Sequence, residues 1–216
     1  MINKSGYKII MTNGIIFVCL LTLLHFYDSE VLEIITFLTC ILFIFNFFFF
    51  RDPEREIPQY ESLIVSPADG KVIKIKEVAE NHYLHNKAIM VSIFMSIFNV
   101  HVNRIPISGE IEYLNYKSGK FIPAFKDKSS DLNERMMVGI KSPQGKILLK
   151  QIAGIIARRI VCNLKKADKV EVGAGFGMIM YGSRVDIIVP LSSKINVQLN
   201  QKVIAGETII GELLYN

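Results

Sequence analysis

Two long apolar segments open the chain, and shorter segments in which apolar and polar residues alternate follow them. Residues 9–27 are almost uniformly apolar, and sixteen of the twenty residues from Val31 to Phe50 are apolar. As a helix, each segment is long enough to cross about 30 Å of hydrocarbon. Because only a few polar residues around Asp28 separate the two helices, they must run antiparallel. The sequence therefore predicts a membrane-associated helical hairpin over residues 1–50.

The charges that flank the hairpin indicate its orientation. Lys4 and Lys8 precede or open the first segment, Arg51 and Arg55 follow the second, and the connection between the segments is acidic. Since basic residues concentrate on the cytoplasmic side, everything after residue 50 is predicted to lie at the cytoplasmic face of the cell membrane. An alternative is a hairpin that lies in one leaflet, because three polar side chains would be costly at mid-depth: Asn13, Glu33 and Asn46.

The rest of the chain, residues 51–216, has the pattern of a mainly β domain. Residues 71–78 alternate apolar and charged side chains, and residues 88–98 form an apolar run between polar turns. Gly, Pro, Asn or Ser separates most of the further candidate strands: 109–114, 146–152, 155–162, 177–181, 185–189 and 207–214. The expected fold is a β sandwich or barrel-sandwich hybrid behind the hairpin.

Two segments of this predicted domain resemble each other. Residues 66–72 and residues 105–111 each combine a proline turn, a glycine and the start of a strand, and they are 39 residues apart. Residues 202–213 resemble the closing hairpin of a lipoyl-like domain, in which Gly206 supplies a tight turn. Carrier domains of that type present a lysine at a hairpin tip, and no matching Met-Lys-Met or Asp-Lys-Ala sequence occurs here. A non-enzymatic adaptor that presents this domain to partner proteins stays open as an alternative.

Composition and charge narrow the function classes. Half of the residues are hydrophobic and the mean hydropathy is +0.34, which is high for a wholly soluble domain. Beyond residue 50 the chain has 23 basic and 17 acidic residues, which favours anionic membrane lipid as a partner. The basic residues are scattered and no nucleic-acid-binding module is recognisable, so nucleic acid is not an expected partner. Cys19, Cys40 and Cys162 are far apart in apolar runs, which fits packed, reduced thiols better than disulfides or a zinc site.

The Gly182-Ser183 step interrupts two apolar strands that would otherwise be continuous. A plain turn is one interpretation, because Gly-Ser marks turns in many proteins. A serine-hydrolase elbow needs Gly-x-Ser-x-Gly, which residues 181–185 do not match. Residues 173–177 imitate a dinucleotide-binding glycine motif, but Met178 stands where the last glycine is required. Neither of those mechanisms is therefore expected.

Five motifs occur in the order seen in phosphatidylserine decarboxylase proenzymes. They are Phe50-Arg-Asp-Pro-Glu-Arg55, Ser66-Pro-Ala-Asp-Gly70, Asn99-Val-His-Val-Asn-Arg-Ile-Pro106, Asn133-Glu-Arg135 and Tyr181-Gly-Ser-Arg184. The chain resembles that family over essentially its whole length. It is most similar to the short branch, the phosphatidylserine decarboxylase-related or archaeal-type form.

The resemblance implies an enzyme that makes its own cofactor by cutting the bond between Gly182 and Ser183. The Ser183 hydroxyl would attack the preceding carbonyl, and elimination and loss of ammonia would leave a pyruvoyl group. The products, residues 1–182 and 183–216, would stay together as a heterodimer, with a larger oligomer left open. The pyruvoyl group would form a Schiff base with phosphatidylserine, which would lose CO2 to give phosphatidylethanolamine, without a metal or pyridoxal phosphate. Another serine phospholipid, such as ether-linked archaetidylserine, is an alternative substrate.

The resemblance also suggests roles for several side chains. His101 is the candidate for proton delivery to the substrate, and the alternative is a histidine packed between strands. Asp69 would assist self-cleavage by orienting or activating Ser183, although Asp-Gly by itself indicates a turn. The longer bacterial enzymes have a second histidine where this chain has Arg104. An arginine cannot act as a base at neutral pH, so Arg104 is predicted to hold the substrate phosphate or carboxylate.

Two further segments of the motif set have alternative interpretations. Arg184 replaces the threonine of the longer enzymes and is predicted either to lie near the substrate head group or to pair with Asp186 on the surface. Residues 133–135 follow a polar stretch without strand or helix pattern. They are predicted to belong to a loop over the site or to an ordinary solvated loop.

Overall fold

The computed structural model describes residues 1–58, 61–120, 122–123, 129–154, 160–180 and 183–214. The chain forms two compact units, Met1–Glu54 and Arg55–Asn216. The first unit contains a short 3-10 helix, η1 (Lys4–Gly6), and two helices, α1 (Tyr7–Phe26) and α2 (Glu30–Phe49). The second unit contains fourteen strands and a short helix, α3 (Ser129–Leu132), within the described residues.

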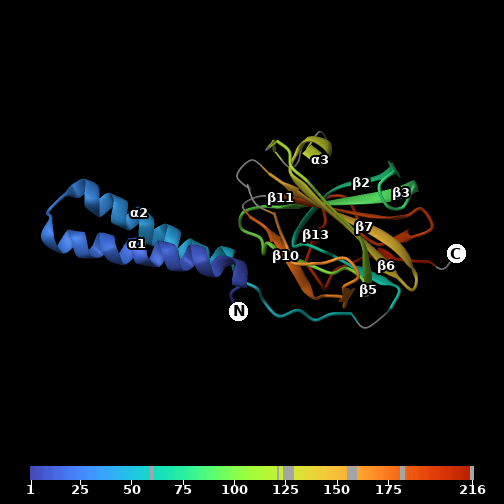
Figure 1. Ribbon diagram of the computed structural model, residues 1–216, viewed down its shortest axis with the longest axis horizontal. Coiled ribbons are helices and arrows are strands. Elements are labelled where there is room, and N and C mark those ends of the chain that lie inside the picture. The colour runs from blue at the N-terminus through green and yellow to red at the C-terminus, as the bar shows by residue number, and fades with distance from the viewer. Residues whose placement is uncertain (59–60, 121, 124–128, 155–159, 181–182, 215–216) are drawn as a thin grey trace. The chain divides into compact units, whose positions relative to one another are not determined.

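The helices of the first unit form the predicted antiparallel hairpin (Figure 1). The start of α1 lies beside the end of α2, because Asn3 N donates to Phe50 O at 2.8 Å. Gly6 allows this approach, since a Cβ atom at this position would lie 2.3 Å from Phe50 Cγ. Further along, the rings of Phe17 and Phe43 stack with centroids 6.1 Å apart.

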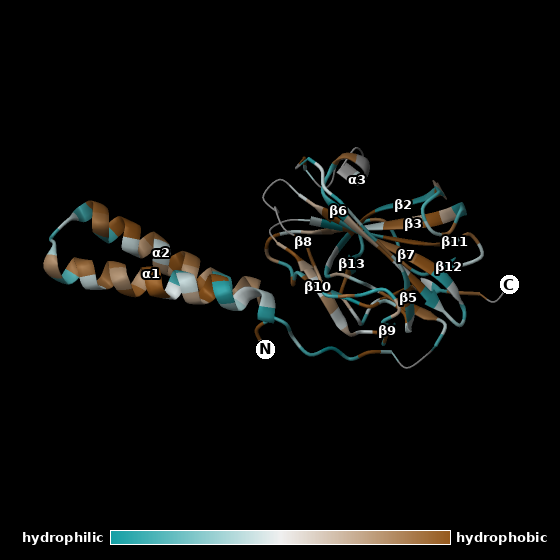
Figure 2. Cartoon of the chain, in the orientation of Figure 1, coloured by the Kyte–Doolittle hydropathy of each residue, from teal (hydrophilic) through white to brown (hydrophobic). Residues whose placement is uncertain are grey.

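Most residues along both helices of the hairpin are apolar (Figure 2). Both helices are long and apolar enough to cross a membrane, judged by length and composition. Large side chains on both helices are more than half exposed: Met11, Ile15, Val18, Phe37, Leu38 and Ile44. Of the polar residues that would be costly in lipid, Asn46 is fully buried within this unit. These features indicate membrane association.

The second unit confirms the prediction of a mainly β domain. Its large sheet has eight antiparallel strands in the order β13-β2-β3-β11-β7-β6-β5-β9, and two three-stranded sheets have the orders β1-β14-β12 and β4-β10-β8. The strand bounds are β1 Leu63–Val65, β2 Gly70–Glu80, β3 Asn86–Met95, β4 Val102–Arg104, β5 Gly109–Lys117, β6 Arg135–Ser142, β7 Gly145–Ala153, β8 Ile160–Cys162, β9 Lys169–Val170, β10 Gly175–Ile179, β11 Ser183–Pro190, β12 Lys194–Ile195, β13 Lys202–Val203 and β14 Ile209–Glu212.

The similarity between residues 66–72 and residues 105–111 extends through the whole β domain. β13 pairs with β2 as β9 pairs with β5, and β2 pairs with β3 as β5 pairs with β6. The small sheets correspond in the same way, with β14 and β10 in their centres. The domain therefore has two similar halves, one made of β1–β3 with β11–β14 and the other of β4–β10. The two halves meet where β11 pairs with β7.

The glycines of the repeat explain why those residues recur. A Cβ atom on Gly70 would lie 2.2 Å from Phe94 O, and one on Gly109 would lie 2.3 Å from Lys141 O. Each position begins a strand whose backbone passes too close to its neighbour for any larger residue. Each proline turn also accepts a hydrogen bond from the strand that precedes the other turn. Val65 N of β1 donates to Pro106 O at 2.9 Å, and Arg104 N of β4 donates to Pro67 O at 3.0 Å.

A second pair of glycines forms equivalent turns in the two halves. Gly173 has φ +81° and Gly206 has φ +79°, in the left-handed region that glycine tolerates best. Ile57, from the segment that follows the hairpin, packs against both, and a Cβ atom on Gly173 would lie 2.3 Å from Ile57 Cδ1.

Replacing Gly173 by alanine is therefore expected to destabilise the β domain by about 1–3 kcal/mol, because a side chain is strained at this φ. A lower thermal unfolding midpoint of the detergent-solubilised chain would show the effect. Gly175→Ala is the matched control, since its Cβ atom would meet only Val102 Cγ1 at 3.4 Å. Equal midpoints for the two variants would contradict the prediction.

The large sheet has a different core on each face. Val185, Ile187 and Val189 of β11 point into the main core, which contains residues from all three sheets. Because side chains alternate along a strand, Ile188 points to the other face. There it belongs to a smaller cluster with Tyr83, Ala88, Met90, Met137 and Leu148. The N-terminal half of β11 thus presents Ser183 and Arg184 to opposite faces.

Most predicted strands are present, with shifted ends, but β6 was not predicted. Residues 135–142 are buried at nearly every position, so they lack the alternation that marks a half-exposed strand. A glycine is required at position 139, in the centre of β6, because a Cβ atom there would lie 2.8 Å from the ring of Tyr83. Of the predicted strand at 155–162, residues 155–159 lie outside the described residues.

Candidate active site

Ser183 is the first residue of the central strand β11 and is fully buried. It pairs with Met95 at the end of β3 on one side and with Ala153 at the end of β7 on the other. Its Oγ donates to Met95 Sδ at 3.5 Å. Gly182, the predicted partner in the scissile bond, lies outside the described residues, as does Tyr181.

Three neighbouring strands leave the large sheet at this point and continue in a small one. β3 leads to β4, β7 leads to β8, and β10 leads to β11. The strands joined by these three connections are neighbours in both sheets, in the order β3-β11-β7 in the large sheet and β4-β10-β8 in the small one. Ser183 thus lies at the central one of three connections between the same two sheets.

His101 lies in the connection between β3 and β4 and is fully buried. Its Nδ1 is 2.9 Å from Asn99 O. Because a carbonyl oxygen can only accept, Nδ1 carries a proton in this hydrogen bond, which fixes the orientation of the ring. The Asn99 side chain closes the turn, since its Oδ1 accepts from Ser96 N at 2.9 Å and from Ser96 Oγ at 2.8 Å. His101 is also near β10, because the next residue, Val102, pairs with Met178.

A chain of buried polar groups supports Ser183 from within the core. Gln151 Nε2 donates to Asn103 Oδ1 at 2.8 Å, and Asn103 Nδ2 contacts Met95 Sδ at 3.8 Å. The same sulfur accepts from Ser183. Sequence reasoning missed Met95, Asn103 and Gln151 as site residues. The sequence signal that could have found two of them is an amide side chain within an apolar strand, Asn103 in β4 and Gln151 in β7. A buried amide needs a hydrogen-bond partner, so two such residues suggest a buried polar contact.

Asn133 holds the end of β7 beside Ser183. Its Nδ2 donates to Ala153 O and to Ile122 O, both at 2.7 Å, and its Oδ1 accepts from Ile122 N at 3.0 Å. Ala153 N donates to Glu134 O at 3.0 Å. Residues 133–135 are all buried, so the interpretation as an ordinary solvated loop is wrong. The polar stretch before them contains α3.

Asp69 leads into β2 and forms an ion pair with Arg55. Arg55 Nη2 lies 3.0 Å from both carboxylate oxygens of Asp69, and Ala205 N donates to Asp69 Oδ1 at 2.8 Å. These bonds join the segment after the hairpin to two turns of the β domain. Because β3 lies between β2 and β11, Asp69 and Ser183 are separated by two strand spacings, about 10 Å.

Arg104 ends β4 and lies in the same neighbourhood as Asp69. Its Nη1 donates to Gly173 O at 2.9 Å. A Cβ atom on Gly206 would lie 3.2 Å from Arg104 Cδ and 3.6 Å from Arg55 Cβ. Arg104 is thus anchored to one of the equivalent glycine turns and faces the other.

Arg184 pairs with Asp186, as one of its two interpretations proposed, but the pair is not on the surface. Nε and Nη2 of Arg184 donate to the two carboxylate oxygens of Asp186 at 2.6 and 2.7 Å. The side chains are 1% and 0% exposed. Ser130 Oγ joins the pair, donating to Asp186 at 2.9 Å and lying 3.1 Å from Arg184 Nη2. The prediction of a surface pair is therefore wrong. Both side chains point to the second face of the large sheet, where other residues cover them.

The surroundings of Ser183 fit a residue that is converted into a pyruvoyl group. The described hydrogen bond of its hydroxyl goes to a thioether sulfur, a weak acceptor. Loss of that hydroxyl would leave no strong buried donor or acceptor without a partner. Pairing with β3 and β7 would hold the new chain end in place. Cys162 is a free, partly exposed thiol on nearby β8, and burial raises its pKa.

Comparison with known proteins connects this geometry to a family. The sequence model of the family described as phosphatidylserine decarboxylase matches residues 42–211. A phosphatidylserine decarboxylase proenzyme of Chlorobium phaeobacteroides is 45% identical over 97% of this chain and 98% of its own length. Proteins of the same name from Carboxydothermus hydrogenoformans and a Wolbachia species are 48% and 45% identical, over 82% and 98% of this chain and 83% and 91% of their own lengths. The chain therefore belongs to the phosphatidylserine decarboxylase family.

Proposed function

We propose that this chain decarboxylates the serine head group of phosphatidylserine to give phosphatidylethanolamine and CO2, with a pyruvoyl group that it makes from Ser183. The observation that carries the proposal is the placement of Ser183. It is a fully buried serine at the first position of a central strand, bonded to a sulfur and held by paired strands on both sides.

Self-cleavage begins at the Ser183 hydroxyl. Its oxygen attacks the carbonyl carbon of Gly182, and the peptide bond breaks as its nitrogen takes up the hydroxyl proton, which leaves an ester. Elimination then removes the α-proton of residue 183 and expels the Gly182 carboxylate, which leaves dehydroalanine at residue 183. Water then releases ammonia from residue 183 and leaves a ketone. Glycine at position 182 has no side chain to shield its carbonyl from the attack.

The two products, residues 1–182 and 183–216, stay together. The smaller product contributes β11, β12, β13 and β14. Three of them pair with the larger product: β11 with β3 and β7, β13 with β2, and β14 with β1, while β12 pairs with β14. Because three strands of the smaller product pair with the larger one, separation would unfold the domain.

The pyruvoyl group supplies a ketone that takes up the substrate amine and withdraws electrons from the carbon that loses CO2. His101 delivers the proton that replaces the carboxylate. Its support is positional: the imidazole is buried, its Nδ1 is held by Asn99 O, and the next residue pairs with β10, the strand that leads to residue 183.

Asp69 and Arg104 act at the edge of this site. Asp69 assists self-cleavage as a positioning residue, because its bonds to Arg55 and Ala205 fix the turn that enters β2 next to β3. Arg104 is half-buried and supplies a guanidinium for the substrate phosphate or carboxylate. Contact between Arg184 and the substrate stays a prediction. Its guanidinium binds Asp186 on the face of the sheet opposite Ser183.

The hairpin holds the enzyme on its substrate membrane, with the β domain at the cytoplasmic face. Lys4, Lys8 and Arg51 supply the basic flanks that favour this orientation. A tethered enzyme meets lipid head groups at a high effective concentration. Anionic lipid is the expected membrane partner of the basic chain.

The test is an assay of the purified full chain in mixed micelles that contain phosphatidylserine. Release of CO2 together with phosphatidylethanolamine is expected, and a parallel assay with an ether-linked archaeal serine lipid measures tail selectivity. Faster turnover of the ether lipid would reassign the substrate. An uncut chain without turnover of either lipid would favour a non-enzymatic membrane adaptor.

A further inference from the structure

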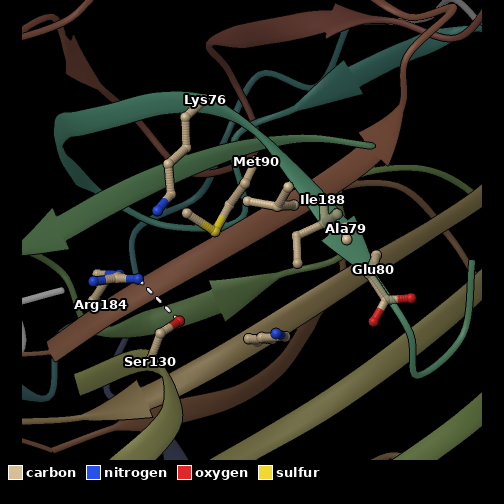
Figure 3. A pocket seen from close by; sticks show the side chains of 9 residues that line it. Lys76, Ala79, Glu80, Met90, Ser130, Arg184 and Ile188 are labelled. Carbon is tan, nitrogen blue, oxygen red and sulfur yellow. Dashed lines mark hydrogen bonds between the residues drawn. The ribbon is translucent and has the colours of Figure 1, made fainter. Parts of the chain in front are cut away.

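A basic cavity lies on the face of the large sheet opposite the Ser183 side chain. Its volume is about 210 Å³. Nine residues line it: Lys76, Val78, Ala79, Glu80, Met90, Ser130, Lys150, Arg184 and Ile188. Figure 3 shows Lys76, Arg184 and Ser130 gathered toward one end and Glu80 at the other. We call this cavity the reverse-face pocket.

Strand register brings the two lysines of this pocket toward each other across the sheet. Lys76 of β2 lies opposite Met90 of β3, which lies opposite Ile188 of β11. Lys150 of β7 lies opposite Asp186 of β11. The backbones of β2 and β7 are three strand spacings apart, about 14 Å, so two long side chains can reach over the strands between them.

Of the other charged lining groups, Arg184 is ion-paired with Asp186, whereas Glu80 stays a carboxylate at the opposite end of the pocket. Arg184 is bound to Asp186 and Ser130. The Glu80 carboxylate accepts from the backbone N–H groups of residues 82, 83 and 84 at 2.7–2.8 Å, and these bonds lower its pKa although burial opposes them. Lys76 and Lys150 have no ion-pair partner among the residues that the structure describes. Two ammonium groups of one sign therefore face a shared cavity.

We propose that the reverse-face pocket binds a phosphate group, either as free phosphate or on a lipid head group. Cavities lined by one sign of charge concentrate counter-ions, and lysine ammonium groups are common phosphate ligands. The volume has room for such an anion, since a water molecule in the liquid occupies about 30 Å³.

The reverse-face pocket and the proposed catalytic site lie on opposite faces of the large sheet, and adjacent residues of β11 belong to them. Ser183 points into the main core, whereas Arg184, the next residue, lines the reverse-face pocket. A bound phosphate would therefore lie on the other face of β11, the strand that begins at the proposed cleavage site. The inference does not depend on the decarboxylation chemistry, because it concerns binding alone.

Lysine reactivity in the full chain tests the proposal directly. The chain is placed in micelles of dodecyl maltoside, a detergent without phosphate, and treated with an amine-acylating reagent, with and without inorganic phosphate, at an ionic strength matched with chloride. Mass spectrometry then gives the acylation rate of each lysine. Lys76 and Lys150 should react at least fivefold more slowly with phosphate present. Lys87 and Lys194, which are exposed on β3 and β12 outside the pocket, should react equally fast in both conditions.

A second arm distinguishes the source of the phosphate. In the same micelles with phosphatidylglycerol, without added phosphate, the same protection indicates a lipid head group; protection only with inorganic phosphate indicates the free anion. Replacing Lys76 by methionine should remove most of the protection of Lys150 in whichever arm shows it. A Lys150 acylation rate that neither phosphate nor phosphatidylglycerol changes, or full protection of Lys150 in the Lys76→Met chain, would overturn the proposal.

Discussion

A Ser183→Ala chain is expected to remain one polypeptide of 216 residues and to show no measurable decarboxylation. Alanine has no oxygen to attack the preceding carbonyl, so neither the cut nor the ketone can form. The fold should persist, because the substitution removes only a bond to Met95 Sδ and leaves the pairing of β11 with β3 and β7 intact. A denaturing gel and the phosphatidylserine assay measure both effects.

The matched control for this variant is Ser92→Ala. Ser92 is a fully buried serine on the neighbouring strand β3, and its hydroxyl has no hydrogen-bond partner within the described structure. This variant should cut and decarboxylate like the wild type. Ser183→Cys adds a positive test, since a thiol can also attack a carbonyl and should give slow cutting. A Ser183→Ala chain that is cut at the same bond would remove Ser183 from the mechanism.

A His101→Gln chain is expected to cut itself and to lose about 10²–10⁴-fold in kcat. Glutamine can keep a hydrogen bond to Asn99 O, but it cannot deliver a proton. The reason to expect a selective loss is geometric. Nδ1 of His101 is held by the turn, the ring is buried, and the next residue pairs with the strand that leads to residue 183. The kcat should be measured on cut material only, with the cut fraction quantified separately.

The control for this variant is His82→Ala, which removes an exposed histidine of the loop between β2 and β3 and should leave both steps unchanged. A His101→Gln chain that fails to cut would move His101 to maturation. A cut chain with wild-type kcat would make His101 a packing residue.

Local patterns in the sequence were sufficient to predict the outline of the fold. The hairpin followed from the length of two apolar segments, and the half-exposed strands followed from alternation. The similarity of residues 66–72 and 105–111 indicated an internal repeat, because glycine is required where β2 and β5 pass close to a neighbouring backbone. β6 could not be predicted in this way, since it is buried on both faces and has no alternation.

The surroundings of the site residues depended on contacts between distant parts of the chain. Ser183 was identified through the resemblance of residues 181–184 to a family motif, but its contact with Met95 spans 88 residues of sequence. The partner of Asp69 is Arg55, which the sequence suggested as a flank of the hairpin and the end of a motif but not as a partner of Asp69. Arg184 and Asp186 could be paired by their spacing of two. Their burial depends on how the second face of the sheet is covered, and spacing carries no information on that point.

Intact mass spectrometry of purified, active wild-type chain tests the central claim most directly. We predict two species, residues 1–182 and a 34-residue fragment from 183 to 216. The smaller fragment should be lighter by one ammonia than simple hydrolysis would leave it, and it should react with a hydrazide. A single uncut chain that decarboxylates phosphatidylserine with Ser183 intact would contradict the account.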